Sequence, residues 1–158
     1  MSRLYFFIGI SAVVVSIFSG CSREKNPVSD HDHGEHTRAV GCVIKLNENE
    51  LVRAEKNKVT GSLSVKQRTE TPAMQFYLIA EDGDLFQPNE QEYVFAWESK
   101  HPEIADIIQY QIDGRWAFRV KGFQAGSTVF IFKVLHGDHA DFVSLDIPVT
   151  VTSDGGGL

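Results

Sequence analysis

The chain has 158 residues, of which 42% are hydrophobic and 23% are charged, and its formal net charge is −6 at pH 7. This length and composition suit one folded domain behind a removable leader. The acidic balance argues against a nucleic-acid partner, because phosphates require a basic protein surface. It fits a protein of the cell envelope, or one with affinity for cations.

The first 20 residues read as a targeting segment. Arg3 precedes an apolar run over residues 4–18 that is too short for a comfortable membrane span. The sequence Phe-Ser-Gly-Cys that ends at Cys21 resembles the bacterial lipobox, in which the cysteine is lipidated and becomes the first residue. The resemblance implies a lipoprotein signal peptide over 1–20 and a lipid anchor on Cys21; the alternative is an ordinary leader with a chance cysteine. The residue that follows Cys21 is Ser22 and not an acidic residue, which favours the outer membrane or cell surface over the inner membrane.

Residues 21–39 are polar and show no hydrophobic period, so they cannot bury a core and are predicted to be a flexible, lipid-anchored tether. The tether is rich in histidine and acid, with histidines at His31, His33 and His36.

Residues 40–153 alternate apolar and polar side chains in short runs, which is the pattern of half-buried strands. The expected strands lie in a hairpin over 40–54 and in the runs 59–65, 74–80, 93–98, 109–120, 130–134 and 145–151. Cys42 shares the parity of its apolar neighbours and is predicted to be a buried small hydrophobe, with a thiolate ligand or reactive thiol as the alternative. Residues 154–158 are expected to be a flexible tail.

Three local features refine this expectation. Asp113 and Gly114 predict a tight hairpin turn inside the run 109–120. Pro148 cannot donate to a strand ladder, which predicts an edge strand or a bulge for the last run. Trp97 and Trp116 lie in phase with other aromatic residues, which favours core positions over a sugar-stacking surface.

A family resemblance is carried by Trp97-Glu98-Ser99, Pro102, Ile104, Ala105, Val120-Lys121-Gly122 and Ala125-Gly126-Ser127-Thr128. Their spacing resembles the repeat signature of bacterial immunoglobulin-like domains of the intimin and invasin type, over roughly the second half of the chain. The resemblance implies an all-β fold: a single immunoglobulin-like antiparallel β-sandwich after the signal peptide and tether. It says nothing specific about function, because this fold carries many.

Chemistry is indicated by histidines and acids in two separate segments. Imidazole and carboxylate ligands suit zinc, copper or nickel, so the candidate ligands for a divalent transition metal are His31, His33, His36, His136, Asp138, His139 and Asp141. In the implied topology the tether, the residues 136–141 and an acidic loop over 81–92 converge at one pole of the sandwich. The alternative is a merely hydrophilic tether and solvent-exposed loop histidines, and His101 is expected to be a surface turn residue.

The sequence contains no Gly-x-Ser-x-Gly elbow, phosphate-binding loop or His-Glu-x-x-His motif, so we expect no enzyme. The first functional hypothesis is a lipid-anchored envelope protein that binds a divalent metal for homeostasis or delivery, with a metal transporter or another envelope protein as its partner. The alternative is an adhesion or scaffolding module that binds protein or glycan and needs no metal.

Overall fold

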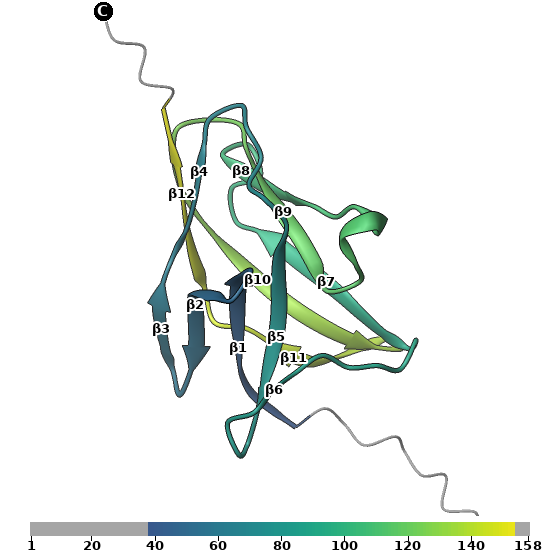
Figure 1. Ribbon diagram of the computed structural model, residues 1–158. Coiled ribbons are helices and arrows are strands. Elements are labelled where there is room, and N and C mark those ends of the chain that lie inside the picture. The colour runs from purple at the N-terminus through teal and green to yellow at the C-terminus, as the bar shows by residue number, and fades with distance from the viewer. Residues whose placement is uncertain (1–37, 154–158) are drawn as a thin grey trace, which may run out of the picture. The chain divides into compact units, whose positions relative to one another are not determined.

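The structure is a computed structural model that describes residues 38–153 (Figure 1). The predicted lipidation site Cys21 and the tether histidines His31, His33 and His36 lie outside the described residues. Within them the chain forms twelve strands and one short 3₁₀ helix: β1 (Ala39–Leu46), β2 (Asn49–Glu55), β3 (Lys58–Gly61), β4 (Leu63–Lys66), β5 (Met74–Ala80), β6 (Leu85–Phe86), β7 (Tyr93–Ser99), β8 (Ala105–Ile108), η1 (Gln111–Asp113), β9 (Ala117–Gly122), β10 (Gly126–His136), β11 (His139–Val143) and β12 (Ile147–Thr152).

The strands form two sheets. The first has the order β3-β2-β1-β5-β9-β8, with β6 added to β5. The second is built around the long strand β10, which pairs with β12 through its first half and with both β7 and β11 through its last residues. Strand β4 completes the second sheet by pairing with β12 in parallel, whereas the other strand pairs are antiparallel. The predicted all-β sandwich is therefore confirmed, with one parallel pair.

Aromatic side chains fill the space between the two sheets. The Phe132 ring on β10 lies 5.5 Å from Phe76, 5.7 Å from Phe95 and 5.1 Å from Phe118, measured between ring centroids. These side chains alternate with solvent-facing ones, because successive residues of a strand point to opposite faces of its sheet. Trp116 is buried and Trp97 is half-buried against the same core, so both tryptophans pack where the sequence predicts.

Two local predictions are wrong in detail. Strand β12 is not an edge, because it pairs with β10 on one side and β4 on the other; Pro148 is tolerated because the pairing with β4 begins only at Val149. The connection between β8 and β9 is longer than a two-residue turn: it contains η1, and Gly114 follows with a φ of 104°. The hairpin itself is present, with Ile108 paired to Arg119.

The start of β1, the turn between β5 and β6 and the end of β10 all lie toward one end of the sandwich, away from the end of β12 (Figure 1). We call this end the pole. The connection that leaves β6 runs to the start of β7, where Tyr93 pairs with His136. The acidic loop and the residues 136–141 thus meet at the pole, as the topology predicts.

Candidate metal centre

The hairpin between β10 and β11 places the two histidines of the pole opposite each other. Its turn consists of Gly137 and Asp138, and Gly137 has a φ of 61°, a value that tight hairpin turns require and that glycine adopts without strain. His136 and His139 are register partners across this turn. The His-x-x-His spacing therefore becomes a cross-strand pair.

Asp141 joins the histidines from β11, through its spacing from His139 and a bulge in that strand. It lies two residues after His139 on β11, and residues two apart on a strand share a face. Val134 pairs with Phe142 and Leu135 with Ala140, so Asp141 is the extra residue of a bulge in β11, and bulges re-aim the side chains next to them. The hairpin alone thus supplies three side chains to one point.

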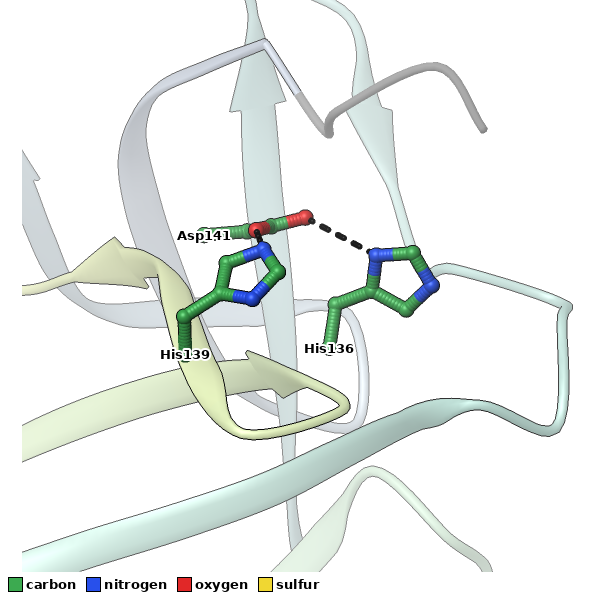
Figure 2. A group of neighbouring side chains, drawn as sticks. All are labelled: His136, His139 and Asp141. Atoms are coloured by element: carbon green, nitrogen blue, oxygen red, sulfur yellow. Dashed lines mark ion pairs between the residues drawn. The ribbon is translucent and has the colours of Figure 1, made fainter. Parts of the chain in front are cut away.

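The three side chains converge closely enough to hold one ion (Figure 2). His139 Nε2 lies 3.0 Å from Asp141 Oδ1, and His136 Nδ1 lies 3.8 Å from Asp141 Oδ2. One ligand atom from each residue falls within 4.8 Å of the other two. Figure 2 shows the Asp141 carboxylate next to both rings. We call His136, His139 and Asp141 the His/Asp cluster.

The cluster is closed on one side and open on the other. The Asp141 side chain is 2% exposed, His136 is 21% exposed and His139 is 54% exposed. His136 Nδ1 is buried and has no hydrogen-bond partner among the described residues. An unpartnered polar atom inside a protein needs a physical explanation, and a role as a metal ligand is one such explanation.

Asp138 was also a predicted ligand, but the structure does not bring it into the cluster. Its side chain is fully exposed, and its Oδ1 lies 3.4 Å from His139 Nδ1, on the imidazole nitrogen that does not face Asp141. His101 is an exposed turn residue that contacts Glu103, as predicted.

Glu92 of the acidic loop and Tyr93 of β7 contact the cluster; the loop was expected at this pole, but neither residue was a candidate ligand. Glu92 Oε2 lies 3.2 Å from His136 Nε2. The Tyr93 ring stacks on the His136 ring, with centroids 4.7 Å apart and planes 24° apart. The signal that could have found them is the register of β7 on β10, which sequence periodicity does not give.

A second group of charged side chains lies on β9 and its neighbours. Arg119 donates two hydrogen bonds to the Asp113 carboxylate, at 2.7 and 2.9 Å, and Lys121 Nζ donates to Glu70 at 2.9 Å. The Tyr110 hydroxyl also donates to Glu70, and its ring lies under the Arg119 guanidinium. The Arg119 hydrogen bonds lower the pKa of Asp113 below its usual value. We call these five residues the Arg119 network.

The thiol of Cys42, the one cysteine among residues 38–153, is not a candidate ligand or nucleophile. Cys42 is completely buried on β1, and burial raises the pKa of its thiol to about 12. A neutral thiol of this kind does not ligate a metal or attack a substrate at neutral pH. The prediction of a buried small hydrophobe is confirmed.

Among residues 38–153, no helix is both long and apolar enough to span a lipid bilayer.

No protein-family model matches the chain, and no curated protein matches it. Solved structures of the S-layer protein SbsC show a distant similarity. Its domains 4 and 5 match with a TM-score of 0.41 at 18% identity, over 70% of this chain and 53% of that one. Domains 4–9 match with a TM-score of 0.43 at 20% identity, over 63% and 14%, and domains 5–6 with a TM-score of 0.42 at 20% identity, over 63% and 42%. The chain thus spans about half or less of each of those structures.

Proposed function

We propose that this chain is a non-enzymatic binding module of the bacterial cell envelope, and that its His/Asp cluster binds a divalent transition-metal ion. The observation that carries the metal proposal is the convergence of one ligand atom from each of His136, His139 and Asp141 within 4.8 Å.

The spacing of these atoms suits tetrahedral coordination. Zinc binds imidazole nitrogen and carboxylate oxygen at about 2.0–2.2 Å, which separates two ligands of a tetrahedral site by ~3.4 Å. The separations of 3.0 Å from Asp141 Oδ1 to His139 Nε2 and of 3.8 Å from Asp141 Oδ2 to His136 Nδ1 lie on either side of that value, one for each oxygen of the carboxylate. Two imidazoles and one carboxylate suit zinc, copper or nickel, and a fourth position remains for water or an incoming donor.

The location rests on the leader. The lipobox-like ending at Cys21 supports a lipid anchor, and β1 begins at Ala39, the last residue of the proposed tether. In this proposal His31, His33 and His36 supply further donors close to Cys21 in the sequence, and a metal transporter or another envelope protein receives the ion. The acidic charge of the chain argues against nucleic acid.

The second candidate is adhesion or scaffolding without metal. It is favoured by the η1 segment, where Ile112 is 93% exposed and Tyr110 is also exposed. Apolar side chains held out in water mark contact sites when they gather into a patch. Binding of a protein or glycan that Ile112→Asp abolishes would support this candidate.

Metal analysis separates the two candidates. The untagged chain, purified in detergent, is titrated calorimetrically with Zn²⁺, Cu²⁺ and Ni²⁺ in a background where His31, His33 and His36 are replaced by Asn. We expect one ion per chain, lost in the His136→Ala/His139→Ala variant and retained in the His101→Ala control. Equal affinity in the double variant would remove the His/Asp cluster from the site.

A further inference from the structure

The two nitrogens of the His136 ring face different partners. Nε2 lies 3.2 Å from Glu92 Oε2, at the end of the acidic loop. Nδ1 is buried and faces Asp141 Oδ2 at 3.8 Å. The ring therefore bridges the acidic loop and the His/Asp cluster.

This placement selects one tautomer. A neutral imidazole carries one N–H donor and one lone pair, and an ionised carboxylate only accepts hydrogen bonds. Glu92 Oε2 lies within hydrogen-bond distance of Nε2 at 3.2 Å, whereas Asp141 Oδ2 is too far from Nδ1 at 3.8 Å, so the contacts favour the proton on Nε2 and leave the lone pair on Nδ1. Nδ1 is the atom that points into the cluster, so the lone pair is directed where a metal would lie.

The plane of the ring is held as well. Tyr93 is the register partner of His136, and its ring is stacked 4.7 Å away, centroid to centroid. Tyr93 is itself buried. Stacking restricts rotation of the imidazole, and the Glu92 contact fixes which nitrogen points inward.

We infer that Glu92 is a positioning residue of the metal site: it orients His136 without touching the metal. The inference rests on the proposed metal function and deepens it. Metal-bound histidines commonly donate their second N–H to a carboxylate, and removal of that partner weakens binding by about 10–100-fold. A metal on Nδ1 would also tie the β6–β7 connection to the β10–β11 hairpin through the Glu92 hydrogen bond.

The test compares three variants of the untagged full chain in the background that lacks the tether histidines. Glu92→Ala removes both acceptor and charge, whereas Glu92→Gln keeps an acceptor oxygen. Glu90→Ala is the matched control, because Glu90 is an exposed acid of the same loop whose backbone carbonyl, not its carboxylate, accepts a hydrogen bond from Arg115. We expect zinc affinity to fall about 10–100-fold in Glu92→Ala, by less in Glu92→Gln, and to stay unchanged in Glu90→Ala.

A second readout does not depend on metal. Nitrogen-15 NMR of the metal-free chain, at a pH where the imidazole is neutral, reports which nitrogen of His136 carries the proton. We expect the Nε2–H tautomer in the parent and a mixture in Glu92→Ala. The visible spectrum of the cobalt-substituted chain should change in the same variant, because the ring that ligates is no longer held.

The outcomes separate this inference from the function on which it rests. A parent that binds no zinc would overturn both. A parent that binds zinc, with Glu92→Ala equal to it in affinity and tautomer, would overturn only the role of Glu92. A loss in Glu90→Ala as large as in Glu92→Ala would assign the effect to the charge of the loop and would also overturn that role.

Discussion

The Arg119 network and the His/Asp cluster both bring carboxylates together at a hairpin, and they differ in which side chains face those carboxylates. In the network, the carboxylates of Asp113 and Glu70 face Arg119 and Lys121, whose charges are permanent at neutral pH. In the cluster, Asp141 and Glu92 face the imidazole rings of His136 and His139, which can also ligate a metal ion.

The difference bears on function. A carboxylate paired with a guanidinium is electrostatically complete, so the network needs no ligand. A buried carboxylate beside two imidazoles is a set of groups that commonly ligate a divalent metal ion, which makes the cluster the candidate binding site. The type of side chain that faces the carboxylates, more than the number of residues, distinguishes a structural network from a candidate binding site.

The largest expected effect is that of removing the charge of Asp141 from the cluster. Zinc at 1,000 times its dissociation constant should raise the free energy of unfolding by about 4.1 kcal/mol. Asp141→Asn keeps the shape of the side chain but removes its charge, and at the same zinc concentration most of this gain should disappear. Chemical denaturation with and without zinc measures it. A full zinc-dependent gain in Asp141→Asn would show that the ion binds elsewhere.

An intermediate effect is expected from the buried thiol of Cys42, which lies in the core and takes no part in the cluster or the network. Its folded pKa of about 12 lies above that of an unfolded thiol, so its stabilisation is complete below about pH 8.5 and is lost as the pH rises toward 12. By pH 10 the parent should lose about 2 kcal/mol of unfolding free energy from this group. Denaturation of the parent and of Cys42→Ala below about pH 8.5 and at pH 10 isolates the contribution of the thiol. An equal loss of unfolding free energy in both proteins would contradict it.

The smallest effect concerns the Arg119 network. Its ion pairs are partly exposed to water and screened by salt, so Arg119→Met should lower the melting temperature only slightly, and by less at high salt. Zinc affinity should not change. The pKa of Asp113 is lowered in the folded chain, so its contribution is present at neutral pH and is lost as the pH falls through that lowered value. A loss of zinc binding in Arg119→Met would mean that the two groups are coupled.

Much of the fold could be predicted because apolar alternation fixes which face of a strand is buried. The runs around Phe76, Phe118 and Phe132 became core strands for that reason. Strand order was harder. The Pro148 strand was expected at an edge, because nothing local to it shows that β4 pairs alongside, one residue beyond the proline.

The candidate site could likewise be predicted where its residues are close in the sequence, and not where they meet through strand pairing. His136, His139 and Asp141 come from one hairpin, so their spacing in the sequence was enough to suggest them. Asp138 has a suitable side chain, but its place in the turn directs it into solvent. Glu92 was missed as a contact because it reaches His136 through the pairing of β7 with β10, which joins segments 44 residues apart.

The most direct test of the metal proposal is anomalous X-ray diffraction at the zinc edge from crystals of the zinc-loaded chain. We predict a peak within about 2.0–2.2 Å of His136 Nδ1, His139 Nε2 and an Asp141 oxygen. Zinc bound only at other residues, or no peak in crystals grown with saturating zinc, would contradict it.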